Sequence, residues 1–109
     1  MPRIDHAALW VSDLAGARDF YVSWFAGRSN GEYHNPATGL RTFIITFEPD
    51  HAGEASSGRS ARLELMSRPD IAASTGADTL GWAHVSFALP GRADVDDLAA
   101  RARAAGVPV

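Results

Sequence analysis

The stretch RIDHAALWVSDLAGARDFYVSWFAGR, residues 3–28, places one histidine in a short apolar run and follows it with an amphipathic segment. From Ile4 to Val11 the residues favour a strand and alternate between two faces. After this run the apolar residues recur at helical spacing, Ser12 or Asp13 can cap the helix, and Gly27 can end it. The stretch therefore predicts a strand followed by a helix that packs on a sheet.

A second stretch, GWAHVSFALPGRADVDDLAARARAAGV, repeats this pattern near the end of the chain. A strand is expected from Trp82 to Leu89, with His84 on it. A helix follows, which Asp94 can cap and Gly106 can end. We interpret the two stretches as an internal duplication. Any two strand–helix units share such a pattern, so two unrelated units remain the alternative.

Three more strands are expected between the two stretches. A short extended piece at residues 32–34 leads through a turn at Asn35–Gly39 into the apolar run Thr42–Phe47. A further strand covers Ala61–Met66. The first part of the chain is thus predicted to have the order β-α-β-β-β.

Composition limits the classes of function. The chain has 109 residues, enough for one domain, and 46% of them are hydrophobic. Its net charge of −3, without long charged runs, argues against nucleic acid as a partner. The absence of cysteine leaves His, Asp and Glu as metal ligands. No apolar run approaches the roughly 20 residues that cross a bilayer, so no membrane partner and a cytoplasmic location are expected.

Three residues form a candidate metal site. His6 and His84 occupy equivalent places in the two repeats, where a pseudo-twofold arrangement would bring them together. Glu64 alternates with Leu63 and Leu65, so its side chain faces away from these two leucines. Two imidazoles and a carboxylate suit a divalent metal ion. We therefore hypothesise that His6, Glu64 and His84 bind such an ion.

Each of these residues also has a simpler interpretation. A strand histidine such as His6 is often a hydrogen-bonded structural residue, and Glu64 can be a solvated charge on an open sheet face. Arg62, on the same face as Glu64, can orient an anionic substrate or pair with a neighbouring acid. Sequence motifs of phosphate loops, dinucleotide folds, α/β-hydrolases and zincins are absent.

The segments DHAALWVSDLAGARDFYVSWFAG, RLELM and GWAHVSF together resemble the vicinal oxygen chelate superfamily, which includes glyoxalase I, bleomycin-resistance proteins, fosfomycin-resistance enzymes and extradiol dioxygenases. This resemblance implies an α+β fold of paired βαβββ modules around a divalent metal ion, Ni, Zn, Fe or Mn. In one domain over residues 1–109, module 1 would cover about 1–67 and a connector about 68–81. The second module, about 82–109, is expected to stop after its helix.

The resemblance also implies a function. His6, Glu64 and His84 correspond to metal ligands, and Glu64 to the catalytic general base of a glyoxalase-type lyase or isomerase. Such an enzyme acts on a small substrate with adjacent oxygens through an enediolate-like intermediate. A drug-binding protein of the bleomycin-resistance type and an extradiol-type dioxygenase are the alternatives. The family's further glutamate, in the last strand of the second module, is not reached by this sequence, and a homodimer is expected.

Overall fold

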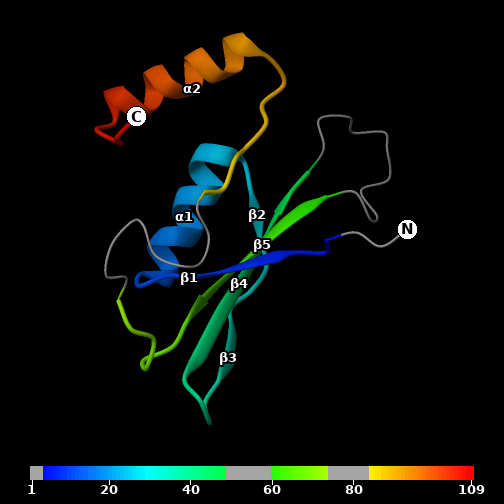
Figure 1. Cartoon of the computed structure of the whole chain (residues 1–109), viewed down its shortest axis with the longest axis vertical. Helices are drawn as coiled ribbons and strands as arrows, with labels where there is room; N and C mark the ends of the chain where they lie inside the picture. Colours follow the sequence, from blue (N-terminus) through cyan, green and yellow to red (C-terminus); the bar gives the residue numbers. More distant parts are fainter. Residues whose placement is uncertain (1–3, 49–59, 74–83) are drawn as a thin grey trace. The chain divides into compact units, whose positions relative to one another are not determined.

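The computed structural model describes residues 4–48, 60–73 and 84–109. The chain divides into two compact units, Met1–Ala73 and Ser74–Val109. The first unit contains a sheet and the helix α1, and the second contains the helix α2 (Figure 1). Neither helix of the described residues has the length and apolar character that crossing a bilayer requires.

The first unit is built around a mixed sheet. Its strands are β1 (Ala7–Trp10), β2 (Arg28–Ser29), β3 (Tyr33–Asn35), β4 (Leu40–Phe47) and β5 (Ala61–Ser67). Their order is β1-β5-β4-β2, and β3 also pairs with β4. Strand β1 is parallel to β5, whereas the remaining pairs are antiparallel. This is one βαβββ-like module with β2 as an additional short strand, and it confirms the predicted fold class.

Helix α1 (Leu14–Phe25) begins and ends close to the predicted positions. The Asp13 carboxylate accepts a hydrogen bond from the Gly16 amide at 3.0 Å and caps the helix. The chain leaves the helix through Ala26, which has a left-handed backbone with φ of 53°. A Cβ atom at Gly27 would lie 2.4 Å from Cγ2 of the buried Ile45. Glycine is therefore needed at position 27 for close packing of the chain on β4.

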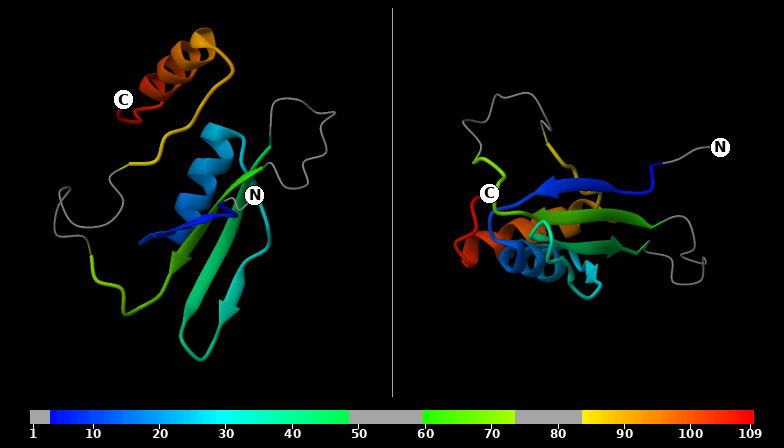
Figure 2. Two further views of the ribbon diagram at one scale, coloured as in Figure 1. Left: turned by 45° about the vertical axis from the view of Figure 1, so that its right-hand side comes forward. Right: turned by 90° about the horizontal axis from the view of Figure 1, so that it is seen from below.

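Helix α1 lies against one face of the sheet, as the view from below in Figure 2 shows, and the hydrophobic core is formed between them. Its buried members are Leu14, Phe43, Ile45 and Leu65. Because side chains alternate along a strand, the intervening residues of β4 and β5 lie on the opposite face. We call this opposite face, which α1 does not cover, the open face.

The second unit contains α2 (Arg92–Ala104), in the predicted place. The prediction that Asp94 caps this helix is wrong: Gly91 is the N-cap residue, without a side-chain hydrogen bond, and Asp94 lies in the first turn. A carboxylate there still interacts favourably with the helix dipole. Gly106 follows the helix with φ of 78°, in agreement with its predicted role.

The predicted strand at 82–89 is wrong for its described residues. Residues 84–89 have no regular secondary structure, and residues 82 and 83 lie outside the described part of the chain. A strand exists only where its backbone groups pair with a neighbouring strand. The described strands, β1 to β5, all belong to the first unit. Alternation of apolar side chains alone was therefore not sufficient to make residues 84–89 a strand.

Candidate functional site

The strand register arranges the open face in three cross-strand rows. The arginine row consists of Arg28, Thr46 and Arg62. The glutamate row consists of Ile44, Glu64 and Ala8. The aromatic row consists of Tyr33, Thr42, Met66 and Trp10. The open face thus changes from cationic at one end, through a single carboxylate, to aromatic at the other.

Glu64 lies in the middle of this face. Its cross-strand neighbours are Ile44 on β4 and Ala8 on β1, both apolar. The residue is half-buried, and no hydrogen bond or ion pair joins its carboxylate to another residue of the described ranges. Partial burial among apolar neighbours weakens the solvation of a charge. The lone pairs of Glu64 are therefore available for a metal ion or a substrate proton.

His6 lies directly before β1, two residues ahead of Ala8, and its side chain is exposed. Its Nδ1 atom is 2.8 Å from Oδ2 of Asp5. Because an ionised carboxylate only accepts hydrogen bonds, Nδ1 carries the proton and donates it. In a neutral imidazole with the proton on Nδ1, the other ring nitrogen, Nε2, has a free lone pair. A carboxylate on one nitrogen and a metal ion on the other is the usual arrangement for metal-binding histidines.

The same Oδ2 atom of Asp5 also accepts a hydrogen bond from Nη2 of Arg62. Hydrogen bonds from His6 and then from Arg62 hold the pKa of Asp5 below its usual value. Asp5 therefore remains ionised and continues to orient the imidazole. Of the two sequence interpretations of Arg62, the structure shows pairing with a neighbouring acid, which leaves a role toward an anionic substrate open.

Glu64 lies on the open face, and His6 precedes β1 at the position that alternation along the chain assigns to the same face. Diagonal neighbours on one sheet face lie about 7–8 Å apart, a separation that an imidazole and a glutamate can bridge to a common ion. His84 is exposed and belongs to the second unit. The described residues contain no preformed group of three His, Asp or Glu side chains that could hold a metal ion. The metal site therefore remains a proposal, although the donor types of His6 and Glu64 suit it.

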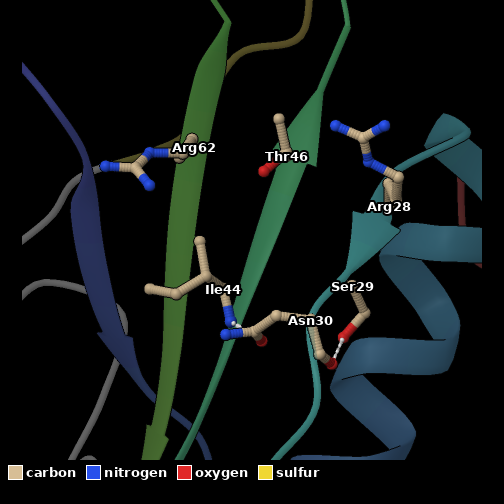
Figure 3. A pocket seen from close by; sticks show the side chains of 6 residues that line it. All are labelled: Arg28, Ser29, Asn30, Ile44, Thr46 and Arg62. Carbon is tan, nitrogen blue, oxygen red and sulfur yellow. Dashed lines mark hydrogen bonds between the residues drawn. The ribbon is translucent and has the colours of Figure 1, made fainter.

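Next to the glutamate row the open face has a hollow of about 300 Å³ (Figure 3). The residues that line it are Arg28, Ser29, Asn30, Ile44, Thr46 and Arg62. Sequence reasoning identified Arg62 but missed the others. Their shared position depends on the pairing of β2, β4 and β5, which no local pattern reveals. The sequence predicted only that Arg62, two residues before Glu64, lies on the same face of the strand as Glu64.

Comparisons with known proteins agree with this architecture. The model of the Glyoxalase/Bleomycin resistance protein/Dioxygenase superfamily matches residues 3–109. The crystal structure of FosX, a genomically encoded fosfomycin resistance protein from Listeria monocytogenes, is similar to the chain with a TM-score of 0.58 and 19% identity. The similarity covers 99% of this chain and 69% of FosX. No curated protein matches the chain.

Proposed function

The chain belongs to the glyoxalase/bleomycin resistance protein/dioxygenase superfamily, and from this premise we propose that it is a metal-dependent lyase or isomerase of the glyoxalase type. The observation that carries the proposal is a set of two donors, Glu64 on the open face and His6 directly before the neighbouring strand β1. His6 is oriented through Nδ1 by Asp5, and Glu64 has no partner among the described residues. The proposed substrate is a small molecule with adjacent oxygens.

In this proposal His6, Glu64 and His84 hold a divalent metal ion, Ni, Zn, Fe or Mn. When bound, such an ion supplies Lewis acidity toward the substrate oxygens. Asp5 keeps the imidazole of His6 in the tautomer that has Nε2 free. Glu64 takes a proton from one substrate carbon and returns it to the neighbouring carbon, as general base and then general acid.

Metal analysis of the full chain tests the proposal. We expect nearly stoichiometric divalent metal, about one ion for each protein chain. Metal binding should be at least about tenfold weaker in His6→Ala and in His84→Ala. His34→Ala is the matched control, because this exposed histidine on β3 alternates with Tyr33 and so faces away from the open face. Glu64→Gln should abolish conversion of the hemithioacetal of methylglyoxal and glutathione.

Other outcomes would contradict this function. A chain that binds no divalent ion but retains an aromatic ligand would be a binding protein, and the exposed Trp10 and Tyr33 of the aromatic row would suit that role. Oxygen consumption with a catechol, in the presence of Fe or Mn, would identify an extradiol dioxygenase instead. In that case Glu64→Gln would leave metal binding largely intact.

A further inference from the structure

The arginine row brings two arginine residues to the lining of the hollow of the open face. Arg28 on β2 and Arg62 on β5 are both cross-strand neighbours of Thr46 on β4. Adjacent strands lie about 4.8 Å apart, so the two arginine backbones are roughly 10 Å apart across the Thr46 hydroxyl. Figure 3 shows Thr46 between the two side chains, with the guanidinium group of Arg28 on the Thr46 side and that of Arg62 pointing toward β1, where it binds Asp5. To close on a small group over Thr46 together with Arg28, the Arg62 side chain must turn away from Asp5.

Both arginines keep unused hydrogen-bond donors. Each uses its Nη2 atom for a carboxylate, Arg28 for Glu48 and Arg62 for Asp5. A guanidinium group has five N–H donors, so donors on Nε and Nη1 remain in each case. Neither of the two acids lines the hollow. The hollow is therefore lined by two guanidinium groups, each of which is also paired with an acid outside the lining.

The Asn30 side chain beside the arginines also offers a donor to the hollow. The Oδ1 atom of Asn30 accepts a hydrogen bond from the Ile44 amide at 2.7 Å, which fixes the orientation of the side-chain amide. The NH₂ group of the Asn30 side chain is therefore the part that can donate a hydrogen bond to a ligand. Ser29 Oγ uses its only O–H to donate to the Asn30 carbonyl oxygen at 2.9 Å, so it offers a ligand lone pairs alone. The two guanidinium groups and the Asn30 NH₂ group are the donors that are complementary to oxygen anions.

We propose that this hollow is a subsite for the anionic group of the substrate, a small organic oxyanion such as a carboxylate or a phosphate ester. The arginine and glutamate rows are two residues apart along each strand, or about 7 Å. An anion held by Arg28 and Arg62 would place the rest of a small molecule over Ile44, beside Glu64. The assignment as a substrate subsite rests on the proposed function, whereas anion binding itself can be measured separately.

The test is calorimetric titration of the full chain with inorganic phosphate, and in a parallel arm with acetate, in the presence of a chelator that removes metal ions. We expect saturable binding of at least one of the two anions. Loss of a charge-assisted contact in Arg28→Gln or Arg62→Gln should weaken that binding about tenfold, and the double variant should abolish it. The preferred anion distinguishes a tetrahedral group from a planar one.

Arg41→Gln is the matched control. Arg41 is an exposed arginine on β4 outside the hollow, so its substitution removes the same charge without changing the lining. Its binding should stay within about twofold of the wild type, as expected for a change in net charge alone. Equal weakening in Arg41→Gln, unchanged binding in the double variant, or no binding of either anion would each overturn the subsite. If the chain binds a metal ion but the Arg28 and Arg62 variants bind the anion as well as the wild type does, the subsite is overturned and the proposed function stands. Anion binding that needs both arginines, in a chain that binds no metal ion, would support the subsite and contradict the proposed reaction.

Discussion

The two strand–helix stretches of this chain have a similar sequence pattern but different structures. In the first, the segment after His6 is the strand β1, which pairs with β5, and α1 packs on the sheet. In the second, the segment after His84 has no regular secondary structure, and Ala102 is the buried residue of α2. Both stretches form their helix. The difference teaches that helices followed from the local pattern here, whereas strands also depended on a partner.

This difference follows from where backbone hydrogen bonds are made. A helix satisfies its backbone groups within the segment itself, so spacing and end residues predict it. A strand satisfies them only through another strand, which can be far away in sequence. Strand β1 finds this partner in β5, more than fifty residues later in the chain. Residues 84–89 belong to the second unit and have no regular secondary structure.

The largest expected effect comes from removing core volume under the first helix. Leu65 is fully buried on the face of β5 that α1 covers, so Leu65→Ala should lower the free energy of unfolding by about 2–5 kcal/mol. Leu98 in α2 is only half-buried, so Leu98→Ala should cost about 1 kcal/mol. Urea unfolding followed by circular dichroism measures both. Equal losses would show that the second stretch has a core as well packed as the first.

The parts of the site that could be predicted are those that depend on alternation or helix ends. The Asp13 cap and the face of Glu64 opposite Leu63 and Leu65 are examples. The arginine row could not be predicted, because it needs the register between β2 and β4. The short β2, of two residues, also carries too little pattern to be recognised.

The glycines after the two helices provide a finer comparison. Their sequence positions suggest one role, but Gly27 avoids a clash with Ile45, whereas Gly106 has a positive φ and open space around its Cβ position. Because Ile45 is fully buried and cannot move aside easily, Gly27→Ala should cost about 2–3 kcal/mol. Gly106→Ala should cost about 1 kcal/mol through backbone strain. The same urea measurement compares them. A larger loss in Gly106→Ala would contradict this assignment of roles.

The smallest expected effect concerns the acid before the first histidine. Asp5 precedes His6, whereas alanine precedes His84, so only the first stretch has an adjacent carboxylate for its imidazole. The pKa of Asp5 is lowered, mainly by the hydrogen bond from His6 and then by that from Arg62. A lowered pKa in the folded state stabilises the fold above the unfolded value, near 3.9, and this contribution is lost as the pH falls through the folded value.

Carboxyl NMR titration tests this directly. The pKa of Asp5 should rise toward its usual value in His6→Ala and, by a smaller amount, in Arg62→Gln, because each variant removes one donor to Oδ2. Asp70 is the internal control: its pKa is lowered by Arg68, so neither variant should change it. If the pKa of Asp5 did not move in His6→Ala, then Asp5 would not orient His6. The two histidines would then differ only in the segments that follow them, the paired strand β1 after His6 and a segment without regular secondary structure after His84.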